Sequence, residues 1–209
     1  MAYKEEFIDV RGSRMQLLRG GAGDPVLYLH GAGGEVAWLP FFEQLSRDFT
    51  VYLPAHPGFS RSDGLEKIDT IEDLAFHYID VMDALKLERP LVVGLSLGGW
   101  LEAELAIRYP QRMRKLVLID AVGLRVENAP IADIFAPTPP ELRRLIFYQP
   151  DSELAKTFVP DAPSSEALEM ILRAREATAR VGWNPFLYDP KLRDRLKHAI
   201  DLLGHDKRW

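Results

Sequence analysis

The sequence predicts an α/β fold: a mostly parallel, doubly wound sheet that carries an inserted group of helices. Three observations predict it. Short, almost wholly apolar runs alternate with helical patterns over the first 123 residues. A serine between two glycines stands where one such run passes into a helix. The alternation then stops, and prolines and helical patterns follow. Strands that alternate with helices at this spacing form parallel sheets with right-handed crossovers.

The predicted sheet begins with a hairpin, because the strand-like runs "EEFIDV" and "SRMQLLR" flank Arg11 and Gly12, which suit a tight turn. Four apolar runs follow, of the kind that is buried on both faces of a parallel sheet. They are "PVLYLHG", "TVYLPA", "LVVGL" and "KLVLIDAV".

Helical patterns lie between these runs. "EVAWLPFFEQLSRDF" predicts a helix with a proline near its start. The clearest helix follows Thr70, which forms a capping-box pattern with Asp73. Apolar residues then recur at helical spacing from Ile71 to Leu85. "LGGWLEAELAIRYP" predicts a further helix that ends at Pro110.

The chain divides into three predicted parts. Residues 1–123 form the sheet core, residues 124–198 a helical unit, and residues 199–209 the start of a return to the core. Within the helical unit we expect three helices: "PPELRRLIFYQ", "SSEALEMILRAREATARV" with Ser164 or Ser165 as its N-cap, and "DPKLRDRLKHA". After them, "IDLLG" predicts one more strand.

Composition excludes several classes of function. The net charge of -5 argues against nucleic acid as a partner, because phosphate binding needs a surplus of Lys and Arg. The chain has no cysteine, which excludes disulfides and thiolate catalysis. "MAYKEEFIDV" lacks the apolar core of a signal peptide, and no apolar run reaches the ~18 residues of a membrane span, so we expect a cytoplasmic protein without membrane contact.

The segment "LVVGLSLGGW" carries the chemistry. A serine hydroxyl is a poor nucleophile unless a base takes its proton. A sharp turn from strand to helix would lift Ser96 clear of the sheet, and side chains at Gly94 and Gly98 would collide with backbone there. The N-terminal N–H groups of the helix would stabilise negative charge on an attacked carbonyl, and the N–H of Leu97 is the natural first donor. The alternative is a glycine-rich turn that only packs a strand against a helix.

A second glycine-rich segment, "LHGAGG", follows another apolar strand. It is nearly free of side chains, so its backbone N–H groups can approach a substrate. Ala32 is the expected second donor to an oxyanion. A plain glycine loop is the alternative.

These motifs, together with "HPGFSRSD" and "RYPQRMRKLVLIDAVG", resemble those of the α/β-hydrolase superfamily over essentially the whole chain. The resemblance implies a serine hydrolase whose helical unit is a cap over the active site. Haloalkane dehalogenases and epoxide hydrolases carry an aspartate at the position of Ser96. A serine there implies a carboxylesterase, thioesterase, lipase or carbon–carbon bond hydrolase.

The family order is Ser, acid, His. The resemblance places the acid in "IDLLGHDKRW", which makes Asp206 the tentative acid, and Asp120 after "VLID" is the alternative acid. No histidine occupies the family's position. We therefore expect that the final strand, the last helix and the segment with the base are missing from this chain.

The five histidines are expected to have other roles. His30, His56 and His77 precede Ser96, with His30 structural and His77 on the polar side of its helix. His198 would end the cap, and His205 would lie in the acid loop.

An apolar pocket is expected from the many aromatic residues of the cap and the two loops. Its lining would include Gly31, Trp38, Trp100 and Trp183, and the substrate would be a small apolar molecule. No cofactor or metal site is expected, and the sequence does not predict the oligomeric state. Two hypotheses remain open. One is a serine hydrolase that acts on an ester-like carbonyl, or on a carbon–carbon bond, through an acyl-enzyme on Ser96. The other is a non-catalytic ligand binder or inactive fragment.

Overall fold

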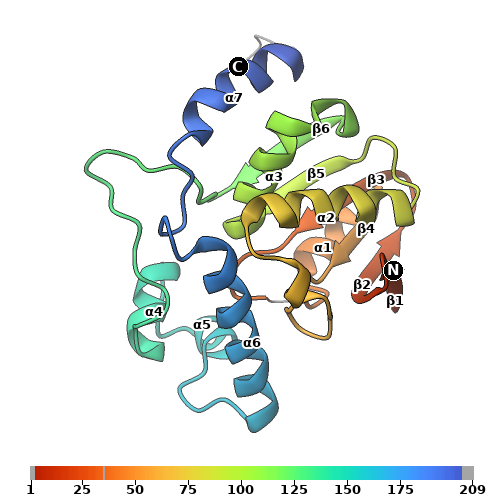
Figure 1. The fold of residues 1–209 in the computed structure, drawn as a ribbon. Helices are drawn as coiled ribbons and strands as arrows, with labels where there is room; N and C mark the ends of the chain where they lie inside the picture. Colours follow the sequence, from red (N-terminus) through yellow and green to blue (C-terminus); the bar gives the residue numbers. More distant parts are fainter. Residues whose placement is uncertain (1–2, 35, 204–209) are drawn as a thin grey trace.

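The computed structural model describes residues 3–34 and 36–203, and it describes side chains as far as residue 197. Six strands form one sheet in the order β1-β2-β4-β3-β5-β6 (Figure 1). β1 and β2 form the predicted hairpin, and β2 pairs antiparallel with β4. The remaining neighbours are parallel, which confirms the predicted class of fold. The strands are β1 (Lys4–Val10), β2 (Ser13–Gly21), β3 (Asp24–Leu29), β4 (Phe49–Pro54), β5 (Leu91–Leu95) and β6 (Lys115–Ile119).

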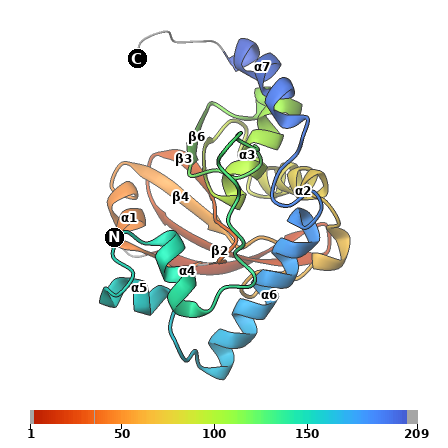
Figure 2. The same cartoon turned by 90° about the vertical axis from the view of Figure 1, so that its left-hand side faces the viewer.

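Helices cover the sheet and extend beyond it. α2 and α3 lie along the sheet, α4, α5 and α6 lie together at one end of the molecule, and α7 lies at the other end beside α3 (Figures 1 and 2). The α-helices are α1 (Pro40–Leu45), α2 (Ile71–Ala84), α3 (Leu97–Arg108), α4 (Pro139–Ile146), α5 (Glu153–Phe158), α6 (Ser165–Gly182) and α7 (Leu192–Leu203). Two short 3-10 helices are η1 (Leu65–Lys67) and η2 (Pro110–Arg112).

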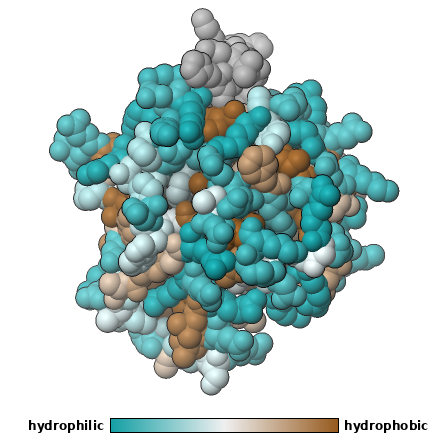
Figure 3. Space-filling model, viewed as in Figure 1, coloured by the Kyte–Doolittle hydropathy of each residue, from teal (hydrophilic) through white to brown (hydrophobic). Residues whose placement is uncertain are grey.

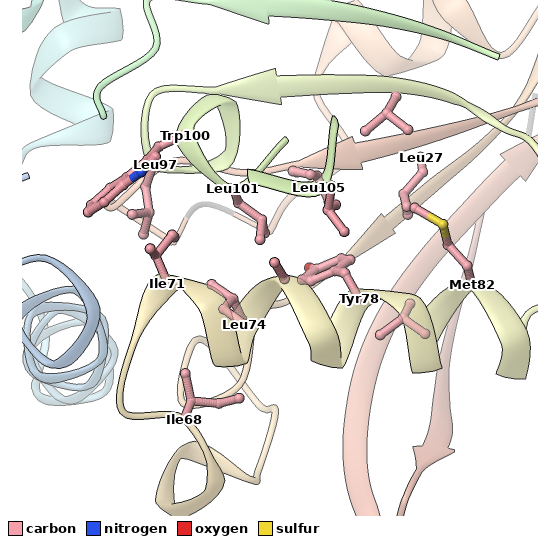
Figure 4. Packing of buried hydrophobic residues seen from close by; sticks show 14 of the residues in the cluster. Leu27, Ile68, Ile71, Leu74, Tyr78, Met82, Leu97, Trp100, Leu101 and Leu105 are labelled. Carbon is pink, nitrogen blue, oxygen red and sulfur yellow. The ribbon is translucent and has the colours of Figure 1, made fainter. Parts of the chain in front are cut away.

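Side chains that alternate along the central strands build two hydrophobic clusters, one on each face of the sheet. In β3, Leu27 and Leu29 belong to the large cluster with α2 and α3, whereas Tyr28 belongs to a smaller cluster with α1. In the large cluster, the apolar side of α2 meets the apolar side of α3, with Leu74 and Tyr78 facing Leu101 and Leu105 (Figure 4).

The capping box that begins α2 is present as predicted. The Thr70 hydroxyl accepts a hydrogen bond from the Asp73 N–H, and the Asp73 carboxylate accepts one from the Thr70 N–H. This reciprocal pair satisfies two backbone donors at a helix start, where no intrahelical acceptors exist. It fixes the start of the helix that covers the core.

Two predicted elements differ from the structure, and one helix was not predicted. α1 begins at Pro40 instead of residue 35, because the residue before a proline is driven out of the helical region, and Leu39 is extended with φ of -79° and ψ of 162°. α7 continues through Leu203, so the strand predicted from "IDLLG" is wrong, and the short apolar run extends an amphipathic helix. α5 was not predicted, although Ser152 caps it through the Ala155 N–H.

The surface is mixed in character. Figure 3 shows a mainly hydrophilic face with scattered hydrophobic patches. Several large apolar side chains of α4, α5 and α6 are exposed, among them Leu145, Ile146, Leu154 and Leu172. Within the described part of the chain, no helix is both long and apolar enough to cross a membrane.

Candidate active site

Ser96 lies at a sharp turn between β5 and α3. Its backbone angles, φ of 53° and ψ of -110°, fall in a region that residues other than glycine rarely adopt. The surrounding structure holds it there: its N–H donates to Ile119 O at 2.9 Å, and its carbonyl accepts from Trp100 N at 3.1 Å. The turn leaves Ser96 half-buried, between β5, whose residues alternate between half-buried and buried, and the buried first part of α3.

Two glycines make this turn possible. A Cβ on Gly94 would lie 2.4 Å from the carbonyl oxygen of Gly98. A Cβ on Gly98 would lie 2.0 Å from the carbonyl oxygen of Leu29. Both distances are far below van der Waals contact with backbone atoms, so any side chain would push α3 away from β3 and β5. These distances agree with the predicted collision of side chains at Gly94 and Gly98 with backbone.

The "LHGAGG" loop lies beside Ser96. A Cβ on Gly31 would be 3.4 Å from the Cβ of Ser96. The loop closes on itself, because Gly34 N donates to Gly31 O at 3.1 Å. Ala32 is half-buried in this loop, and Leu97 is the first residue of α3. The first N–H groups of a helix lack an intrahelical acceptor and carry the positive end of its dipole. The structure thus brings together the two segments that the sequence suggested as donors to an oxyanion.

A chain of hydrogen bonds occupies both ring nitrogens of two buried histidines. His30 Nδ1 donates to Gly31 O at 2.8 Å, and His30 Nε2 accepts from the His56 N–H at 2.9 Å. His56 Nε2 donates to His30 O at 3.0 Å, which leaves its Nδ1 to accept from the Tyr78 hydroxyl. A neutral imidazole has one N–H donor and one acceptor nitrogen, and the contacts of both rings match this pattern. This assigns structural roles to His30, as predicted, and to His56.

Burial keeps this network uncharged. It lowers the pKa of His30 to about 4 and the pKa of His56 well below its usual value, where the neighbouring His30 lowers it further. Burial also raises the pKa of the Tyr78 hydroxyl. With both nitrogens engaged, neither imidazole is free to take the proton of a serine.

The other histidines and the acids do not complete a triad within the described residues. His77 lies outside the row of buried residues of α2 and is half-buried, with its Nε2 enclosed, and burial lowers its pKa to about 4. Asp120 directly follows β6 with φ of 44°, and its side chain is exposed. Among the described side chains, none makes a hydrogen bond to the Ser96 hydroxyl. The side chain of His198, and both Asp206 and His205, lie outside what the structure describes.

The tryptophans expected in a pocket lie apart. Trp38 belongs to the α1 cluster, where it stacks on Tyr3 with ring centroids 5.0 Å apart. Trp100 is buried on the other face of the sheet and donates to Glu104 at 2.9 Å. Trp183 is 61% exposed and packs edge-on against Phe135. The structure therefore does not bring these three side chains together, whereas Gly31 does lie beside Ser96.

Two buried carboxyl groups on α3 were not predicted. Glu102 and Glu104 are fully buried. Glu102 accepts from the Val117 N–H at 3.1 Å, and burial raises its pKa to about 9. Burial also raises the pKa of Glu104, although Arg108 and Trp100 donate to it and lower the pKa in part. The apolar residues on every side of them in "GGWLEAELAI" were the available signal. Within the described ranges, no group of three acidic or histidine side chains is placed to hold a metal ion.

Comparison with known proteins assigns the family. The sequence profile of the α/β hydrolase fold matches residues 24–163. The chain therefore belongs to the α/β hydrolase fold family, as the sequence motifs suggested.

Curated relatives match more than half of the chain. The 2-hydroxy-6-oxo-2,4-heptadienoate hydrolase of Pseudomonas putida is 36% identical over 136 residues, and the match covers 61% of this chain and 49% of that protein. The 2-hydroxymuconate semialdehyde hydrolase of a Pseudomonas species is 34% identical over 143 residues, and the match covers 65% of this chain and 50% of that protein. The chain thus spans about half the length of these curated relatives.

Solved structures share the fold. A serine hydrolase involved in carbazole degradation superposes with a TM-score of 0.69 at 20% identity, covering 93% of this chain and 76% of that chain. The 2-hydroxy-6-oxo-6-phenylhexa-2,4-dienoate hydrolase from a Rhodococcus species gives a TM-score of 0.68 at 22% identity, covering 93% and 78%. At this identity the similarity establishes the fold alone.

Proposed function

We propose that this chain is a serine hydrolase in which Ser96 attacks a carbonyl carbon. One observation carries the proposal: Ser96 is held in a strained conformation between β5 and α3, directly beside the Gly31 loop. Such strain persists only where the surrounding structure over-determines it, and it concentrates at functional sites. The same turn places Ser96 at the N-terminus of α3, the positive end of the helix dipole.

The proposed reaction proceeds through an acyl-enzyme. The Ser96 oxygen bonds to the carbonyl carbon, and the carbonyl π electrons move onto its oxygen. The N–H groups of Ala32 and Leu97 then donate to this oxyanion. Collapse of the tetrahedral intermediate breaks the bond to the leaving group, which takes up a proton. Water then attacks the acyl-enzyme and releases the acid. The Ser96 proton needs a base, and we assign that base to a group outside the described side chains.

The substrate class comes from the relatives. Three of them are named as hydrolases of 2-hydroxy-6-oxo-dienoates, in Pseudomonas putida, Comamonas testosteroni and Burkholderia cepacia. In such substrates a ketone at C6 is conjugated with an enol, so attack on the ketone and release of a carbanion-like fragment breaks a carbon–carbon bond. We propose a vinylogous diketone of this kind as the first substrate to test. A simple ester, cleaved as by a carboxylesterase, is the alternative.

A fluorophosphonate probe tests the nucleophile, because it reacts covalently with an activated serine. The purified 209-residue chain is incubated with the probe and the adduct is located by mass spectrometry. We expect an adduct on Ser96 that Ser96→Ala abolishes. Ser165→Ala, at an exposed position of α6, is the matched control and keeps the adduct. A folded chain without any adduct contradicts the proposal.

The second candidate function is a ligand binder without catalysis. The engaged nitrogens of His30 and His56 favour it, because they leave Ser96 without a base among the described side chains. Incubation with a 2-hydroxy-6-oxo-dienoate and with a p-nitrophenyl ester separates the possibilities. Loss of the dienolate absorbance supports carbon–carbon cleavage, and nitrophenol release supports an esterase. Saturable binding without turnover or adduct supports the binder.

A further inference from the structure

One face of α6 packs onto the loop beside Ser96. The buried residues of this helix recur three and four positions apart, which places them on one side of it. They are Ala174, Ala177, Thr178 and Gly182. The Cβ of Ala174 lies 3.3 Å from the place that a Cβ on Gly34 would occupy. The small side chains on this face let α6 approach the loop closely.

Polar contacts fix α6 along its length. Arg173 donates to Ser62 O at 3.0 Å, and Arg180 donates to Leu65 O at 2.8 Å. Both acceptors belong to the segment between β4 and α2. Figure 2 shows α6 passing beside the end of α2, in agreement with the contacts between the two helices. The position of α6 relative to the sheet is therefore well defined.

Thr178 is the one hydroxyl on the buried face of α6. It is 1% exposed, and its Oγ1 donates to Ala32 O at 3.4 Å. A buried hydroxyl without a partner costs free energy, and valine would fill the same volume without that cost. The hydroxyl is therefore explained by its contact with the loop rather than by packing.

The Thr178 hydroxyl gives the Ala32 carbonyl a hydrogen-bond donor from outside the loop. Gly31 O accepts from His30 Nδ1 and from the Gly34 N–H. The next carbonyl, that of Ala32, accepts from Thr178 on a helix 146 residues away in sequence. The Ala32 N–H shares one rigid peptide with the Gly31 C=O, and the Ala32 C=O belongs to the next peptide, which is joined to the first at the Ala32 Cα. His30 and Gly34 therefore hold the peptide that carries the N–H, and Thr178 holds the peptide that follows it.

We propose that Thr178 is a positioning residue that holds the Gly31–Gly34 loop with the Ala32 N–H directed at the Ser96 site. This inference rests on the proposed function, in which that N–H binds the oxyanion. It also couples the placement of α6 to the reactivity of Ser96, although α6 contributes no reacting atom.

The test compares Thr178→Val, which removes the hydroxyl and keeps the shape, with Thr178→Ser, which keeps the hydroxyl. Hydrogen exchange of the amides of residues 31–34 reports the loop, and the rate of fluorophosphonate reaction reports Ser96. The loss of one neutral hydrogen bond changes an equilibrium or rate constant by about threefold to tenfold. We expect Thr178→Val to speed exchange and slow phosphonylation by about threefold or more in a protein that stays folded. Thr178→Ser should stay within about twofold of the wild type.

The outcomes separate this inference from the proposed function. Unchanged exchange in Thr178→Val overturns the inference, even if Ser96 is labelled. Faster exchange with an unchanged labelling rate also overturns the positioning role. A loosened loop in a protein that is never labelled supports the contact and counts against the proposed function. If Thr178→Val does not fold, Thr178→Ala against Thr178→Ser gives the same comparison.

Discussion

Replacing Glu102 with glutamine should change how stability depends on pH. Glu102 lies fully buried on α3, where its carboxyl accepts from the Val117 N–H at 3.1 Å. Its other oxygen, Oε2, is enclosed without a hydrogen-bond partner among the described residues. Burial favours the neutral acid, whereas an unfolded chain exposes the group to water, where it ionises. Glutamine has nearly the same shape and cannot ionise.

The magnitude follows from the two pKa values. The pKa of Glu102 is raised from the ordinary value of 4.5 to about 9. Between these values the folded chain binds one proton more than the unfolded chain, so stability falls as pH rises. The slope is about 1.4 kcal/mol per pH unit. The contribution of the protonated acid is fully present below the unfolded pKa and is lost as pH rises toward the folded pKa. From pH ~5 to pH ~8, the wild type should lose at most about 4 kcal/mol relative to Glu102→Gln.

Urea unfolding at four pH values across this range measures the difference. Pairwise subtraction removes every other titrating group that the two proteins share. Glu88→Gln, at an exposed position, controls for the change of charge. We expect the advantage of Glu102→Gln to grow with pH. Parallel stability curves for wild type and Glu102→Gln would show that the buried carboxyl is not held neutral, and would refute the reasoning.

Three further changes test the site. Ser96→Gly should be more stable than Ser96→Ala by about 1 kcal/mol, because glycine adopts the strained φ of 53° freely. Thermal unfolding of the two variants measures this difference. Gly98→Ala should destabilise by about 1–3 kcal/mol or more, because its Cβ meets Leu29 O, and a denaturation midpoint equal to wild type would contradict this. Tyr78→Phe should cost about 1–3 kcal/mol in urea unfolding, because His56 Nδ1 loses its donor. A loss below experimental error would show that the donor adds nothing.

Local signals predicted much of the fold. The apolar runs became parallel strands, and the capping box of Thr70 and Asp73 set the start of α2. The glycines of the Ser96 turn were predicted for a steric reason that the distances bear out. Each of these depends on residues close together in the chain, so the sequence displays both partners of the interaction.

Predictions failed for residues whose surroundings come from segments far away in the sequence. "IDLLG" is short enough to suit a strand or a helix, and α7 absorbs its first residues. The burial of Glu102 and Glu104 depends on how α3 packs, and Glu102 is bonded by Val117 of β6. Trp38 and Trp100 looked like members of one pocket, but the sheet lies between their clusters.

The sequence by itself determined the class of fold and the candidate nucleophile, because strand periodicity, helix caps and the glycines around Ser96 are local patterns. Tertiary structure alone decided which groups surround that serine. It joined His30, His56 and Tyr78 into a neutral buried network and brought Thr178 onto the carbonyl of Ala32. Hydrogen bonds between segments far apart in the chain depend on the packed sheet and helices, and no pattern of neighbouring residues encodes them.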